Sequence, residues 1–104
     1  MKNYVLALLL VLAGCASTGG AVDKTKMAEG YYMKGLSYLQ DRNYELALVE
    51  FQRSVNTNSK NKLSYYALGL VNDMQGKLKE AETFYKESID IDSDFSEAHN
   101  AIGV

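Results

Sequence analysis

From Ala28 onward the sequence repeats itself with an offset of 34 residues, and this period constrains the fold more than any other feature. Small, aromatic and hydroxyl side chains recur together. The recurring pairs are Gly35 with Gly69, Ala47 with Ala81, Phe51 with Tyr85, Ser54 with Ser88 and Val55 with Ile89. A third copy begins at Ser96 and places Gly103 in the position of the two earlier glycines. Such self-similarity is the signature of a chain built from stacked copies of one supersecondary unit.

Each unit is predicted to be a pair of helices. Apolar residues recur within it at helical spacing, and a polar break divides it in two. The break in the second unit is Gly76, a residue suited to the left-handed conformation that follows a helix end. We therefore predict helices over residues 28–40, 44–57, 62–75 and 78–91, and another from about 96. An apolar heptad does not continue across the breaks, which argues against a coiled coil.

Packing inside the units and at the helix ends follows from residue size and charge. We expect small residues to face each other within a hairpin, Gly35 opposite Ala47 and Gly69 opposite Ala81. The aromatic rings of Phe51 and Tyr85 should then fill the space between hairpins. The spacing also predicts two polar pairs, a capping box of Asp94 with Glu97 and an exposed ion pair of Glu82 with Lys86.

This pattern resembles the tetratricopeptide repeat, a 34-residue unit with Trp, Leu, Gly and Tyr in its first helix and Ala, Phe or Tyr, and Ala in its second. The resemblance implies an all-α fold of antiparallel helical hairpins in a right-handed α-solenoid. Two full repeats would span residues 28–61 and 62–95, and a third would start at 96–104. The departures from the family pattern are Lys34 in place of Leu, Asn72 in place of Tyr, and Ser59 and Ser93 in place of Pro.

The resemblance also implies a binding groove, because the first helices of successive repeats in this family line a concave surface that receives a peptide or helix of a partner protein. Carried over position by position, the groove residues are Glu29, Tyr32, Leu36, Leu39, Gln40, Leu63, Tyr66, Leu70, Asp73 and Met74. The set is mostly apolar, with Tyr32 and Tyr66 as rigid anchors. An alternative stays open, in which part of this surface packs under the N-terminal segment or against further repeats.

The N-terminus has the architecture of a signal peptide. Lys2 precedes an apolar run over residues 4–13, and small residues close it. A bilayer-spanning helix needs about 20 residues, so this run is too short. The tetrapeptide Leu12-Ala13-Gly14-Cys15 resembles the lipobox of bacterial lipoproteins, which implies cleavage after residues 1–14 and lipidation of Cys15. The alternative is an ordinary cleaved signal with an incidental cysteine.

The predicted lipoprotein would be held by Cys15 and a flexible tether over residues 15–27. In Gram-negative lipoproteins an aspartate after the cysteine marks inner-membrane retention, and here that residue is Ala16. The resemblance therefore implies a bacterial cell membrane location by lipid anchor, at the outer membrane and facing the periplasm.

Charge and residue usage exclude several functions. With 11 basic and 13 acidic residues the net charge is −2, and the charges are interspersed, which argues against nucleic-acid binding. One cysteine and one histidine cannot build a zinc or haem site, so we expect no metal and no cofactor. His99 falls at a core position, and the Asp and Glu residues are expected on exposed helix faces without partners, which leaves no catalytic constellation.

The predicted function is therefore that of a membrane-anchored adaptor that binds a partner protein and is not an enzyme. The alternative is a pilotin-like assembly factor for an outer-membrane secretin or a type IV pilus system. The sequence stops inside the first helix of the third unit, so we expect an incomplete domain. Two explanations are open, a fragment of a longer lipoprotein or completion of the third hairpin by a second copy or a partner, with Ile102 and the Phe95 region against the uncovered surface.

Overall fold

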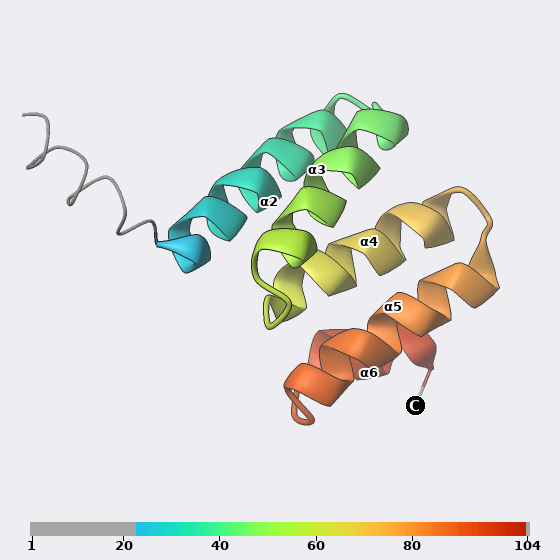
Figure 1. Cartoon of the computed structure of the whole chain (residues 1–104). Helices are drawn as coiled ribbons and strands as arrows, with labels where there is room; N and C mark the ends of the chain where they lie inside the picture. Colours follow the sequence, from blue (N-terminus) through green and yellow to red (C-terminus); the bar gives the residue numbers. More distant parts are fainter. Residues whose placement is uncertain (1–22, 104) are drawn as a thin grey trace, which may run out of the picture.

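The computed structural model describes residues 23–103, and every regular element within that range is a helix (Figure 1). The helices in chain order are α2 (Lys24–Gln40), α3 (Tyr44–Thr57), α4 (Lys62–Met74), α5 (Leu78–Ile91) and α6 (Ser96–Ile102). Helix α2 packs on α3 and α4 packs on α5, while α3 lies against α4 and α6 against α5. The predicted all-α fold, two helical hairpins followed by the first helix of a third unit, is confirmed.

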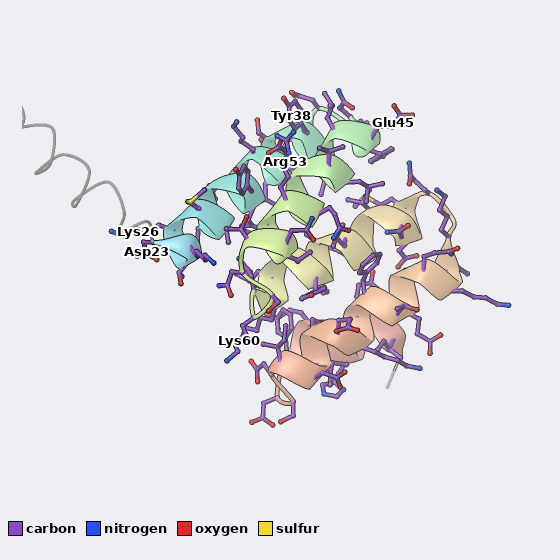
Figure 2. The ribbon with its side chains drawn as sticks, viewed as in Figure 1. Asp23, Lys26, Tyr38, Glu45, Arg53 and Lys60 are labelled. Atoms are coloured by element: carbon purple, nitrogen blue, oxygen red, sulfur yellow. The ribbon has the colours of Figure 1, made fainter. Side chains whose placement is uncertain are left out.

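Side-chain caps fix where the first three helices begin. Asp23, Asn43 and Asn61 each accept hydrogen bonds from backbone N–H groups in the first turn of the helix that follows. Asp23 and Lys26 mark the start of α2 in Figure 2. Because Asp23 caps α2, this helix begins at Lys24, four residues before the predicted start, and residues 24–27 are helical where a tether was expected.

The two hairpin turns share one geometry. Gly76 lies two residues after the end of α4 and has a φ of +77°, and the N–H groups of Gly76 and Lys77 donate to carbonyls of the last turn of α4. This confirms the predicted role of Gly76. Arg42 occupies the same place after α2 at a φ of +58°, the one non-glycine residue in the described range with a positive φ.

The core lies between the two hairpins, where buried side chains of α3 and α4 form one cluster. Its members are Ala47, Phe51, Val55, Ala67, Leu68 and Val71. The three heavy atoms nearest to a Cβ built at Gly35 all belong to the Phe51 ring, the closest at 2.4 Å, so this ring lies nearer to Gly35 than the predicted neighbour Ala47. Gly69 stands in the same relation to Tyr85, at 2.3 Å. The glycines therefore admit an aromatic ring of their own hairpin.

A buried hydroxyl network joins the first three helices. The Ser54 hydroxyl donates to the Ala28 carbonyl oxygen at 2.7 Å and lies 2.6 Å from the Ser64 hydroxyl. In the next unit Ser88 and Ala98 occupy the positions of Ser54 and Ser64. Because Ala98 offers no hydroxyl, Ser88 donates to the Tyr85 carbonyl of its own helix instead, at 2.6 Å. The junction between α5 and α6 thus lacks the hydroxyl contact that joins α3 to α4.

Helix α6 begins at Ser96 as predicted, but the predicted capping box of Asp94 with Glu97 was wrong, because the N-cap residue is Phe95 and no side chain caps the helix. The Phe95 ring is buried against the second unit, 5.3 Å from the Tyr66 ring, so this region is covered by the chain itself. The predicted ion pair of Glu82 with Lys86 is confirmed at 3.0 Å.

In the range 23–103, none of the helices has the length and apolar character needed to cross a bilayer. The predicted signal peptide at residues 1–14, lipidation at Cys15 and the tether up to residue 22 lie outside the described residues.

Candidate partner-binding groove

The groove residues predicted from the repeat lie on α2 and α4, which are in contact. Their exposure divides them in two. Tyr32, Leu36, Leu39, Tyr66 and Leu70 are half-buried, and the first three pack against the core. The exposed members are Glu29, Gln40, Leu63, Asp73 and Met74. The groove set thus combines fixed rings and leucines with two freely accessible apolar side chains, Leu63 at 42% and Met74 at 57% exposure.

Tyr32 and Tyr66 hold equivalent positions in the two repeats and pack in the same way. The Tyr32 ring lies 5.9 Å from Phe51 at an angle of 44°, and the Tyr66 ring lies 5.7 Å from Tyr85 at 42°. Tilted aromatic pairs at this separation are favourable beyond their buried area. Each tyrosine is therefore held in place by its own hairpin. Neither hydroxyl makes a hydrogen bond to another described residue.

Burial sets the ionisation of the tyrosines around the groove. It raises the pKa of Tyr32 above its ordinary value of 10.0, and the nearby Tyr66 adds to this. Burial also raises the pKa of Tyr85, and the Asp73 carboxylate, which accepts a hydrogen bond from its hydroxyl at 3.2 Å, raises it further. These phenols stay neutral at physiological pH and can donate hydrogen bonds.

One end of the groove opens into a hollow of about 260 Å³, here called the loop hollow. It lies where α2 and α4 begin and the loop between α3 and α4 passes, near Lys60 in Figure 2. Its lining residues are Thr25, Glu29, Tyr32, Asn58, Lys60, Asn61, Lys62 and Leu63. The structure thus brings together three predicted groove residues, Glu29, Tyr32 and Leu63, with amides and lysines that the sequence reasoning did not select.

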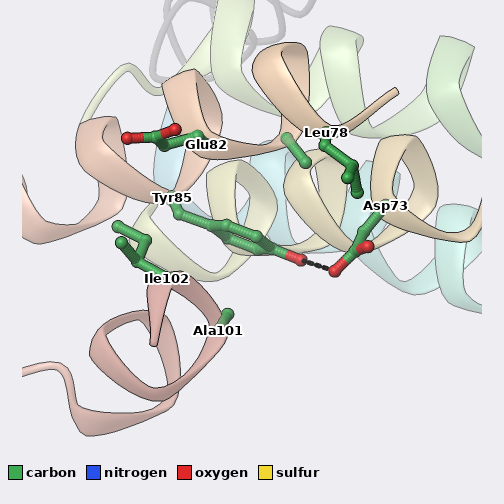
Figure 3. Close-up of a pocket in the computed structure, with 7 residues that line it drawn as sticks. Asp73, Leu78, Glu82, Tyr85, Ala101 and Ile102 are labelled. Carbon is green, nitrogen blue, oxygen red and sulfur yellow. Dashed lines mark hydrogen bonds between the residues drawn. The ribbon is translucent and has the colours of Figure 1, made fainter. Parts of the chain in front are cut away.

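A second hollow of about 290 Å³, here called the α6 hollow, lies between α4, α5 and α6 (Figure 3). Its lining residues are Asp73, Leu78, Ala81, Glu82, Tyr85, Ala101 and Ile102. Of these, only Asp73 belongs to the predicted groove set. The signal that could have found the others is the period itself, because an offset of 34 places most of them on residues of the first core and its borders. The α6 hollow is the second repetition of that core, left open.

The structure also bears on the predictions made for the acidic residues and for His99. The expectation that acidic residues lie on exposed faces without partners was wrong for Glu50, which is 6% exposed and pairs with Arg53 at 3.0 Å. His99 is half-buried, and its Nε2 lies 2.8 Å from the Ser93 carbonyl oxygen, a contact within the fold. Across residues 23–103, no group of three or more His, Cys, Asp or Glu side chains is placed to hold a metal ion.

Comparisons with known proteins place the repeat in a family. A family model described as Tetratricopeptide repeat matches residues 28–61 and 63–95. A crystal structure of MamA has a TM-score of 0.72 and 33% sequence identity, covering 78% of this chain and 47% of that one. Protein bimA of Emericella nidulans is 31% identical over 64 residues, which are 62% of this chain and 8% of bimA. The chain therefore spans less than half the length of either relative.

Proposed function

This chain belongs to the tetratricopeptide repeat family, a scaffold for protein–protein interaction, and we propose that it acts as a membrane-anchored adaptor whose groove holds a segment of a partner protein. The observation that carries the proposal is the arrangement of Tyr32 and Tyr66. Both rings are braced by an aromatic neighbour of the same hairpin, while their hydroxyls donate no hydrogen bond to another described residue. Rigid amphipathic anchors of this kind dominate binding energy in protein interfaces.

The chemistry of the groove favours a partner segment with apolar side chains. Leu63 and Met74 offer accessible apolar surface at opposite ends of α4, with Tyr66 and Leu70 between them. The loop hollow adds Lys60 and amide groups at one end, and Asp73 supplies a carboxylate at the other. An amphipathic helix or an extended segment with an apolar stripe and polar ends would match this distribution.

The membrane part of the proposal rests on the sequence of residues 12–15. Acylation of Cys15 with two or more chains would give stable attachment without a spanning helix. The proposed site is the outer membrane, facing the periplasm. A narrower role as a pilotin-like assembly factor for a secretin or pilus stays a prediction.

Photo-crosslinking from the groove tests the adaptor function. A photoreactive phenylalanine analogue replaces Leu63 or Met74 in the lipidated protein in its native membrane, and an exposed residue of α3, Gln52, serves as the matched control. We expect both groove positions to crosslink to the same partner and the control to give none. Equal crosslinking from Gln52, or no partner from either groove position, would overturn the proposal.

Labelled palmitate tests the anchor separately. The label should enter the chain and be lost in Cys15→Ser, which should also leave the membrane fraction. Equal labelling of the variant, or a mature N-terminus at another residue, would show that the anchor assignment is wrong while leaving the groove intact.

A further inference from the structure

One side of α2 has a shallow apolar hollow of about 240 Å³, lined by Met27, Gly30, Tyr31 and Lys34. The surface formed by these four residues is here called the end face. Met27 is 42% exposed, Gly30 and Lys34 are exposed, and Tyr31 is half-buried. No atom lies within 4 Å of a Cβ built at Gly30, so space is open above it. At helical spacing these residues lie on a different side of α2 from the groove residues Glu29 and Leu36.

The chain itself shows what covers this kind of face. An offset of 34 places the four end-face residues on Asn61, Ser64, Tyr65 and Leu68 of α4. That face of α4 is covered, since α3 packs against α4, Ser64 bonds to Ser54, and Ser64 and Leu68 are at most 2% exposed. The same surface of a first helix is therefore buried by a helix in one repeat, whereas in the other no helix of residues 23–103 covers it.

The differences between the two faces specify the occupant. Lys34 stands in the place of Leu68, and it takes part in none of the ion pairs formed among residues 23–103. Gly30 stands in the place of Ser64 and offers space where the serine offers a hydroxyl. A helix that covers the end face thus needs a carboxylate opposite Lys34 and a larger apolar side chain over Gly30.

Glu82 of α5 is a carboxylate at the position that would lie opposite Lys34. The residue equivalent to Lys34 in the third unit is Ile102, which lines the α6 hollow together with Ala81 and Glu82 of α5 (Figure 3). A helix with the sequence of α5, placed on α2 as α5 is placed on α6, would therefore bring its Glu82 to Lys34. Opposite charges that meet at a partly buried surface favour correct pairing and register.

We propose that the end face binds an amphipathic helix of a partner protein, laid across α2 as α3 lies across α4, with an acidic residue opposite Lys34. This site is distinct from the groove and does not depend on it. A second copy of the chain is a poorer occupant, because the matching face of its α5 is already covered by α6. A lipid surface is also poorer, since a concave strip one helix wide fits the ridge of a helix.

A synthetic peptide with the sequence of residues 78–91, LKEAETFYKESIDI, is the probe for this site. It is titrated into the isotope-labelled chain from Ala16 to Val104, which contains every described helix, and amide chemical shifts are followed by NMR. Because an isolated helix of this length is marginal in water, the titration extends to roughly millimolar peptide. We expect shift changes at Met27, Gly30, Tyr31 and Lys34.

Charge exchange makes the test specific. The Glu82→Lys peptide should bind about fivefold more weakly, and the Lys34→Glu chain should restore its binding, as expected for one ion pair. Lys34 is exposed, so the variant should keep its fold, which a thermal melt checks. Absent shifts at the end face, shifts confined to α4 and α6, or equal affinity of both peptides would overturn the proposal.

Two control titrations address the other occupants. Vesicles of phosphatidylglycerol and phosphatidylcholine should leave the end-face shifts unchanged, and so should dilution of the chain without peptide. If the vesicles perturb the same four residues more strongly than the peptide does, the occupant is a lipid surface. If their shifts depend on chain concentration alone, it is a second copy, and in either case the partner-helix proposal is wrong.

Discussion

At the scale of single residues, Gly69 explains why each repeat has a glycine in its first helix. A Cβ at this position would lie 2.3 Å from the Tyr85 ring, which is itself buried and leans on Tyr66. The ring therefore packs directly on the helix backbone. The anchor tyrosine of the groove depends on this contact, because any displacement of Tyr85 also shifts the ring that braces Tyr66.

The Gly69→Ala variant should consequently be destabilised. Overpacking in a core costs about 1–3 kcal/mol, and the gain of about 1 kcal/mol in helix propensity offsets only part of it, so we expect a net loss of about 1–2 kcal/mol. Gly30→Ala is the matched control, since nothing lies within 4 Å of the added Cβ and the propensity gain should remain. Urea unfolding of both variants measures the difference, and equal stability would contradict the contact.

The family resemblance predicts Tyr32 and Tyr66 as groove residues, but the sequence does not show which side chain lies closest to each glycine. A period shows which positions are equivalent, whereas facing partners depend on the rotation of two helices about their axes, and this placed the rings of Phe51 and Tyr85 on the glycines. The burial of Glu50 was missed for a related reason. In a helical pattern a charged residue is assigned to the exposed side of the helix. The structure shows that Glu50 of α3 is instead buried.

At the scale of the elements, most helix ends followed from sequence because breaks between apolar runs coincide with capping residues. The start of α2 did not, since its cap is Asp23, which precedes the first repeat, and periodic apolar residues begin only at Met27 and Ala28. The end of α2 also differs from that of α4. Arg42 adopts the left-handed conformation that glycine supplies in the equivalent turn, at Gly76.

The Arg42→Gly variant should therefore be more stable than the natural chain. Non-glycine residues pay about 1–2 kcal/mol for the left-handed conformation, and the greater freedom of glycine in the unfolded chain cancels part of the gain, so we expect about 0.5–1 kcal/mol. Gly76→Arg makes the opposite exchange in the second turn and should lose a similar amount. A change of the same sign in both variants, measured by thermal unfolding, would refute this account.

At the scale of the whole molecule, the period predicts two closed hairpins and the start of a third, and the two hollows follow from the same period. At the end face, the surface of α2 that corresponds to the buried face of α4 is exposed, and the α6 hollow lies beside α6, the short helix that covers the corresponding face of α5. The sequence predicts an uncovered surface beside Ile102, which lines the α6 hollow, but not the end face, because the groove positions were carried over from the inner side of the first helices. The offset of 34 relates the residues of both hollows to residues at the interface between α3 and α4.

One ion pair closes the second repeat. Lys62 at the start of α4 pairs with Asp92 just after α5, and its ammonium also lies 4.9 Å from the centre of the Phe95 ring. The hydrogen bond from Lys62, helped by the backbone N–H of Asp94, lowers the pKa of Asp92 below its ordinary value of 3.8. The pair thus connects both ends of the second hairpin to the residue that precedes α6.

This pair predicts a specific acid sensitivity. A carboxyl whose pKa is lowered by folding contributes stability above its ordinary pKa, and the contribution is lost as the pH falls through the lowered value. The melting temperature should therefore drop between about pH 5 and pH 2, and Asp92→Asn should be less stable at pH 5 with a shallower drop. Asp94→Asn, two residues away and outside the ion pairs formed among residues 23–103, is the control and should keep the natural slope.

Because the ammonium of Lys62 also lies over Phe95, the Asp92→Asn variant should in addition loosen α6, seen as faster amide exchange at His99 and Asn100 than in the control. Parallel slopes for all three proteins would mean that the pair contributes nothing to closing the second repeat.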